Sequence, residues 1–174
     1  SPALATTTRD LVDTAQIALD HHWGLDHGSW SVLRVMYPDA DLPVIQLSID
    51  RTKDGPWHLA LARELKALRN RGVMIIGSGN IVHNLGRLRL DVSGGFDWAL
   101  EFDATVKALI DAGDVGALAN YQALGRAATL SVPTPEHYLP LLYTLGVTDP
   151  DEPIRYTNAR CMAGSLSMRS LIVG

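Results

Sequence analysis

The sequence predicts an α/β fold with a mixed β-sheet and helices on both faces, and three patterns lead to this prediction. Two short apolar runs, Pro43–Ile49 and Val73–Ile76, have the length and composition of buried strands. Between them, Trp57–Arg69 has the apolar spacing of a helix, and this order favours a parallel strand pair joined by a right-handed crossover. Near the end of the chain, Ile154–Ala159 and Ser165–Val173 alternate as two antiparallel closing strands do.

The segment before the first of these runs predicts a helix, a strand, a loop and a second helix. A helix is expected over Pro2–Asp13, and Ile17–Leu19 is a short strand candidate. His21–Ser29 is polar and contains glycine, which is typical of a loop. Trp30–Tyr37 is expected to be a short helix, because Pro38 cannot continue it.

The remaining elements are helices. The apolar face of the helix predicted over residues 57–69 is formed by leucines at helical spacing: Leu61, Leu65 and Leu68. Gly72 follows as its C-terminal cap. Phe96–Ala112 predicts a second long helix, shorter helices are expected over residues 114–128, and Pro135–Leu145 predicts a last one.

Composition and charge narrow the class of protein. The 174 residues are enough for one domain with a hydrophobic core, so residues 1–174 are expected to form a single domain. The net charge of −4, without a basic stripe, argues against a nucleic-acid partner. No apolar run approaches the roughly 20 residues that span a membrane. The single cysteine, Cys161, excludes an internal disulfide and favours a reducing compartment such as the cytoplasm.

Histidines are the residues best suited to chemistry in this chain, and three of the six stand in unusual places. His27 lies in the glycine-flanked run GLDHGSW, His83 follows the turn GSGN, and His137 opens the helical run EHYLPLLY. Ligands of α/β proteins gather at the carboxyl ends of strands, which favours a site role for His83. Taken singly, each could equally be a capping residue or a hydrogen-bonded core residue.

The other chemical candidates give weaker signals. His21 and His22 are expected to be solvated, His58 to be a surface residue of its helix, and Cys161 to be a packing residue. The HExxH, CxxC, GxSxG and phosphate-loop motifs do not occur. A metal-dependent hydrolase gains little support, because no carboxylate-rich metal motif is present.

Several ordered blocks carry a resemblance to a known family. They are GLDHGSWSVLRVMYPDADLPVIQLSID, GVMIIGSGNIVHNL, FDWALEFD, PEHYLPLLYTLG and the closing GSLSMRSLIVG. Together they cover nearly the whole chain from about residue 16 onward. The chain resembles the class III extradiol ring-cleavage dioxygenases of the 4,5-DOPA extradiol dioxygenase type. The resemblance implies a catalytic domain that opens a DOPA-like catechol with O₂ and needs one divalent metal, Fe(II) or Zn(II).

The resemblance also implies roles for particular residues. His137 matches a metal ligand, and His83 matches the active-site acid–base residue, with a role as a second ligand left open. His27 matches a catalytic residue that lines the substrate pocket, and Asn80 and Tyr138 are expected to be polar groups of that pocket. These types suit the chemistry, because imidazole titrates near neutral pH and can take a proton from a catechol hydroxyl.

The resemblance further implies parts that this sequence does not contain. The two other histidine ligands of the family are expected upstream of Ser1, so the domain is expected to be incomplete at its N-terminus and to show one or two ligands by itself. Another segment or another chain is then expected to complete the sheet. The alternative is a non-enzymatic, dioxygenase-like binding or assembly module without a complete metal site, and metal analysis with intact-mass measurement would separate the two.

Overall fold

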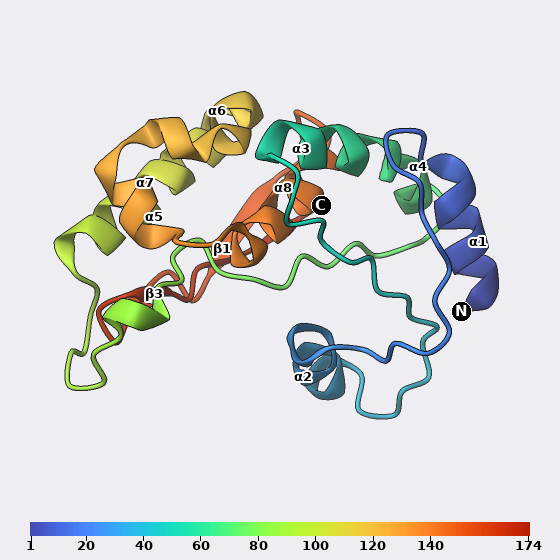
Figure 1. The fold of residues 1–174 in the computed structure, drawn as a ribbon, viewed down its shortest axis with the longest axis horizontal. Coiled ribbons are helices and arrows are strands. Elements are labelled where there is room, and N and C mark those ends of the chain that lie inside the picture. The colour runs from blue at the N-terminus through green and yellow to red at the C-terminus, as the bar shows by residue number, and fades with distance from the viewer.

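The structure, a computed structural model, describes residues 1–174 and has the shape of an arch (Figure 1). The α-helices are α1 (Pro2–Leu11), α2 (His27–Met36), α3 (Gly55–Glu64), α4 (Lys66–Arg69), α5 (Asp97–Asp111), α6 (Val115–Ala119), α7 (Arg126–Ser131) and α8 (Leu139–Gly146). Single 3₁₀ turns are η1 (Leu85–Arg87), η2 (Tyr121–Leu124) and η3 (Pro135–His137). None of the helices combines the length and the apolar character needed to cross a bilayer.

The strands form two short antiparallel ladders at the end of the chain. Strand β1 (Ile154–Thr157) pairs with β4 (Ser170–Val173), and β2 (Cys161–Met162) pairs with β3 (Leu166–Ser167). The α/β class is therefore confirmed, and so are the antiparallel closing strands. The ladders contain no parallel strand pair, so the predicted mixed sheet is reduced to two antiparallel pairs.

The predicted parallel strand pair is wrong for this structure. Residues 17–19, 43–49 and 73–76 run in extended form, but no backbone hydrogen bond joins them to one another. Val73 and Ile75 pack on the core, whereas Met74 is 63% and Ile76 is 44% exposed. A strand needs a neighbouring backbone to form its ladder, and apolar composition alone does not supply one.

Local signals explain the first long helix. The Asp54 carboxylate accepts a hydrogen bond from the Trp57 amide at 3.0 Å and caps α3, while Pro56 occupies its first turn. The helical pattern pauses at Leu65, continues as α4, and ends before Gly72, whose φ of 76° closes the turn. The predicted helix over residues 57–69 is thus two helices in sequence.

Helix α8 lies at the centre of the core. On one side it contributes Leu139 and Leu142 to a cluster with Phe102 of α5, and on the other it contributes Tyr143 to a cluster with Leu61 of α3. His137 precedes α8 by two positions, so a helix that packs in both clusters of the core fixes the start of the candidate site.

Buried polar groups tie the C-terminal segment and the loop before α3 to this core. The Arg169 guanidinium pairs with Asp103 at 2.6 Å, and the Ser167 hydroxyl donates to the same carboxylate. His58 is fully buried and bridges the Tyr143 hydroxyl at 2.8 Å and the Asp50 carbonyl at 3.0 Å. The prediction that His58 lies on the surface is therefore wrong, because α3 turns this face toward α8.

Candidate active site

Two of the three candidate histidines lie in direct contact. The rings of His83 and His137 are stacked, with centroids 3.5 Å apart and planes 16° from parallel. The His83 amide donates to the Ser131 carbonyl at 2.9 Å, and the Asn80 amide donates to the His137 carbonyl at 2.8 Å. The first bond joins His83 to the end of α7 and the second joins the GSGN turn to η3, so segments about fifty positions apart in the chain meet at the histidine pair.

Glycine explains how closely these segments approach. A Cβ atom at Gly79 would lie 2.1 Å from the His137 carbonyl oxygen, and one at Gly77 would lie 2.4 Å from the Pro140 carbonyl oxygen. Only a residue without a side chain fits against backbone at such distances. The glycines of GSGN therefore serve close packing against η3 and α8, and this packing places His137.

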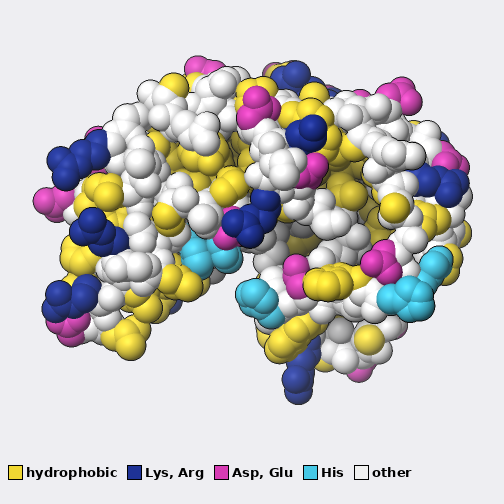
Figure 2. Space-filling view, viewed as in Figure 1, with side chains coloured by type: hydrophobic (Ala, Val, Ile, Leu, Met, Phe, Trp, Pro, Cys, Tyr) yellow, Lys and Arg dark blue, Asp and Glu magenta, His cyan; other side chains and the backbone are white.

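His27 lies near this pair at the start of α2, close enough for its charge to act on His137. The predicted loop over His21–Ser29 is wrong at its end: His27 is the first residue of α2, because the Asp26 carboxylate caps this helix by accepting from the Ser29 amide at 2.9 Å. The Ser78 hydroxyl donates to the Gly28 carbonyl at 2.7 Å and holds the start of α2 beside the GSGN turn. Figure 2 shows histidine side chains on both sides of the hollow at the mouth of the arch.

The electrostatics of the pair favour neutral imidazoles. Burial lowers the pKa of His83, and the neighbouring His137 lowers it further, while Glu136 acts in the opposite direction. Burial also lowers the pKa of His137, which Glu136 raises and the charge of His27 lowers. A neutral imidazole is the form that can accept a proton or bind a metal ion.

Two charged residues beside the pair were missed by the sequence analysis. Glu136 accepts a hydrogen bond from the Thr134 hydroxyl at 2.8 Å through one carboxylate oxygen, while the other, Oε2, is buried without a hydrogen-bond partner. The Arg51 Nε lies 3.7 Å from that oxygen, too far for a hydrogen bond. The only signal in the sequence was the position of Glu136 directly before His137.

The two predicted polar groups of the pocket are engaged elsewhere. The Asn80 side-chain amide donates to the Ser167 carbonyl at 2.8 Å and so binds the closing strands. Tyr138 is fully buried, and its hydroxyl donates to the Leu118 carbonyl at 3.0 Å. The structure therefore places Tyr138 in the core, packed on the rings of Phe102 and Tyr121, and not at the histidine cleft.

The histidine pair fits a metal ion only in part. Imidazole suits Fe(II) and Zn(II), but no group of three or more His, Cys, Asp or Glu side chains in residues 1–174 is arranged to hold a metal. A metal binds in the plane of an imidazole at about 2.1 Å from its nitrogen. Because the His83 and His137 rings are stacked, an ion in the plane of one lies far outside the plane of the other. As placed, only one of them can be a ligand of a given ion.

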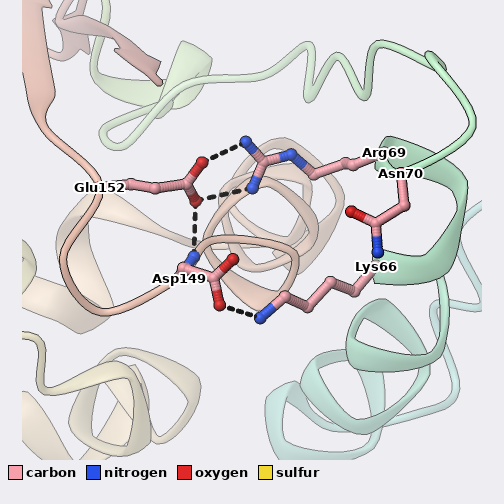
Figure 3. A pocket seen from close by; sticks show the side chains of 5 residues that line it. All are labelled: Lys66, Arg69, Asn70, Asp149 and Glu152. Atoms are coloured by element: carbon pink, nitrogen blue, oxygen red, sulfur yellow. Dashed lines mark hydrogen bonds and ion pairs between the residues drawn. The ribbon is translucent and has the colours of Figure 1, made fainter.

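One cavity lies beside α4 and another at the start of α3, and they differ in the charges of their lining. One of about 170 Å³ is lined by Lys66, Arg69, Asn70, Asp149 and Glu152, and its four charged residues pair with one another as Figure 3 shows. Its charges are satisfied internally, so we assign it a structural role. The other, of about 370 Å³, adjoins η3 and is bordered by Arg51, Lys53, Tyr121 and Pro135.

Comparison with known proteins defines the class of this fold and site. Residues 1–163 match the family model described as the catalytic LigB subunit of aromatic ring-opening dioxygenase, and the chain belongs to this family. The resemblance found in the sequence is thereby confirmed.

Individual relatives agree with this assignment. The whole chain is 48% identical to a protein of Escherichia coli K12 named 4,5-DOPA dioxygenase extradiol, and covers 66% of it. A protein of the same name from Beta vulgaris is 36% identical over 84% of this chain, which covers 56% of that relative. The crystal structure of an uncharacterized protein from Escherichia coli K12 superposes with a TM-score of 0.87 at 43% identity, over all of this chain and 73% of that one. The chain thus spans less than two thirds of the length of these curated relatives.

Proposed function

We propose that this chain takes part in the extradiol opening of a DOPA-like catechol by O₂, in the cytoplasm. The observation that carries the proposal is the stacked His83–His137 pair with His27 near it at the start of α2. The names of the relatives support the reaction class and the substrate type.

Each histidine has a distinct role in this proposal. His137 would hold a divalent metal, Fe(II) or Zn(II), which supplies Lewis-acid binding of the two catechol oxygens. His83, neutral and stacked on His137, takes the proton from a catechol hydroxyl and returns it to an oxygen of the opened product. His27 donates a hydrogen bond to a substrate oxygen from the opposite side of the cleft. The stacking supports His83 as a proton-transfer residue and not as a second ligand.

Further strands are part of the proposal, because the extended segments lack partners. No backbone amide of residues 74–79 donates to another backbone group, and the apolar side chains of Met74 and Ile76 are exposed. Unpaired, two-sided apolar strands favour pairing with another strand. We propose that a segment outside residues 1–174, from the same protein or from another chain, pairs with them and brings the remaining imidazole ligands.

Substitution of His83 tests this function. In the natural protein, His83→Ala should retain catechol binding and lose about 10²–10⁴-fold in the rate of ring opening, because a proton-transfer group is removed. The measurements are calorimetric binding without O₂ and the absorbance of the opened product with O₂. His22→Ala, which removes an exposed histidine, is the matched control.

The possible results separate the roles. An unchanged rate in His83→Ala would exclude it from the mechanism. Loss of the metal in this variant would make it a ligand instead. A natural protein that binds metal and catechol but forms no opened product would favour the non-enzymatic module.

A further inference from the structure

Arg51 and Glu136 form an unusual pair at the edge of the histidine cleft. The Glu136 Oε2 atom is buried without a hydrogen-bond partner, although buried carboxylate oxygens are normally satisfied. Its nearest cation, the Arg51 Nε, stands 3.7 Å away. The pair is thus within electrostatic reach without a hydrogen bond, and the remainder of the Glu136 side chain, 33% exposed, is open to a cationic group.

Arg51 in turn has free donors. Its side chain is 65% exposed and approaches Glu136 only through Nε, so the two terminal nitrogens of the guanidinium form no hydrogen bond in the structure. The planar fork of arginine binds a carboxylate through two parallel hydrogen bonds. Arg51 therefore presents a carboxylate-binding fork beside an unsatisfied carboxylate oxygen.

The loop that carries Arg51 is held in place. The Asp50 side chain accepts bonds from the Thr52 amide at 2.9 Å and the Thr52 hydroxyl at 2.6 Å. The Asp50 carbonyl is bound by the buried His58 at 3.0 Å. Asp50 is engaged within the loop and Asp54 caps α3, and neither acid forms an ion pair with the Arg51 guanidinium.

A cavity lies beside this pair with room for a ligand. It measures about 370 Å³ and is bordered by Arg51, Lys53, the start of α3 at Gly55, and Pro135. Arg51 and Lys53 favour a negative group there, although the Asp54 carboxylate, which caps α3, also lines the cavity. Pro135 and His137 belong to one 3₁₀ turn, so this short turn joins the cavity to the histidine pair.

We infer that Arg51 and Glu136 bind the zwitterionic head of an aromatic amino acid, with its carboxylate on Arg51 and its ammonium group on Glu136. This inference rests on the proposed function and names the part of the substrate that selects it. The short link between head and ring places the ring at His83 and His137. An aromatic amino acid is then favoured over a catechol that lacks either charge.

Four ligands with the same catechol ring test the two contacts separately. DOPA carries both charges, dihydrocaffeate only the carboxylate, dopamine only the ammonium group, and ethylcatechol neither. Their binding to the natural protein is measured by calorimetry without O₂. Arg51→Gln should weaken DOPA and dihydrocaffeate by about tenfold or more, since a hydrogen bond between charged groups is lost, and leave ethylcatechol unchanged. Glu136→Gln should weaken DOPA and dopamine to a similar extent.

Arg71→Gln is the matched control, because Arg71 is exposed and forms no ion pair. Retained affinity for ethylcatechol shows that each variant is folded.

Equal binding of all four ligands by the natural protein would overturn the inference. A uniform loss in Glu136→Gln would assign Glu136 to the ring end and overturn its ammonium role. Ring opening is assayed separately. Selective binding without opened product would refute the proposed function but not the binding site for the charged head. Opened product without selective binding would refute the binding site for the charged head but not the proposed function.

Discussion

The helical body, α3–α8, and the α2 arm, here residues 13–54 with the segment 73–79 beside it, both contain many apolar residues but bury them to different degrees. In the body, Phe102, Leu118 and Leu142 are almost fully buried. In the arm no residue is buried, and Trp23 is 73% and Val35 81% exposed. A helix satisfies its own backbone bonds and can pack at once, whereas an extended segment must find a partner first. His83 and His137 are attached to the body, and His27 to the arm.

Hydrogen exchange should show the largest difference. In the 174-residue chain, the amides in the middle of α5 should exchange only on global unfolding, which typically costs about 5–15 kcal/mol. The amides of residues 74–79 donate to no backbone carbonyl, so they should exchange with little protection. Mass spectrometry of timed, quenched samples measures both. Equal protection would mean that the extended segments are paired in solution, and would contradict the structure.

Truncation of side chains should give the next largest difference. Phe102→Ala removes a ring that is 1% exposed and should lower the free energy of unfolding by about 3–5 kcal/mol. Val35→Ala in α2 should change it by about 0.5 kcal/mol or less, because the side chain is exposed. Urea denaturation measures both variants. A large loss in Val35→Ala would show that α2 is covered in solution.

The sequence predicted the elements of the body better than those of the arm. A helix depends on interactions between residues close in the chain, whereas a strand depends on a partner that can be distant in the chain. The helix expected over Phe96–Ala112 is α5, Asp97–Asp111, because its apolar period is a local property. Val73–Ile76 has strand composition but no neighbouring backbone, and no local pattern shows whether a partner is present. The closing strands were found because both partners lie close together in the chain.

The candidate site was predicted only in part, because some of its features depend on contacts between distant segments of the chain. The ordered blocks named His27, His83 and His137, and the structure stacks the last two and holds the start of α2, which carries His27, beside the GSGN turn. Arg51 and Glu136 were missed, because burial of a single carboxylate oxygen depends on packing between distant segments. Tyr138 was assigned to the pocket from its neighbour His137, although the next position along a turn points in another direction.

Glycine substitutions should give an intermediate effect at the junction of the two regions. In Gly79→Ala the new Cβ would lie 2.1 Å from the His137 carbonyl oxygen, so the backbone must shift. Such overpacking costs about 1–3 kcal/mol of the free energy of unfolding, and here it should also separate the stacked rings. Gly24→Ala meets no atom within 4 Å and serves as the control in the arm. Thermal unfolding gives the stability, and the imidazole signals in NMR spectra report the stacking; unchanged signals in Gly79→Ala would contradict the assigned packing.

Lowering the pH should have the smallest effect on the free energy of unfolding, and it should act through an ion pair of the helical body. Arg69 binds Glu152 through two hydrogen bonds, of 2.7 and 2.5 Å, and thereby ties the turn before β1 to α4 (Figure 3). The hydrogen bond from Arg69, followed by that from the Asp149 amide, lowers the pKa of Glu152 from 4.5 to about 2. A lowered folded-state pKa means that the pair stabilises fully above pH 4.5 and that this stabilisation is lost as the pH falls toward 2.

Glu152→Gln should therefore lower the free energy of unfolding at neutral pH by about 1 kcal/mol or less, because the pair is partly exposed. The variant should also lose less stability than the natural chain between neutral pH and pH 3. Asp41→Asn removes an exposed carboxylate of the arm that forms no ion pair, and its unfolding curves should match those of the natural chain at every pH. Urea denaturation across this range measures all three proteins. If Glu152→Gln lost stability in acid as steeply as the natural chain, another carboxylate would be responsible. The Arg69–Glu152 pair would then contribute packing alone, and the stability of the body would come from the two apolar clusters that meet on α8.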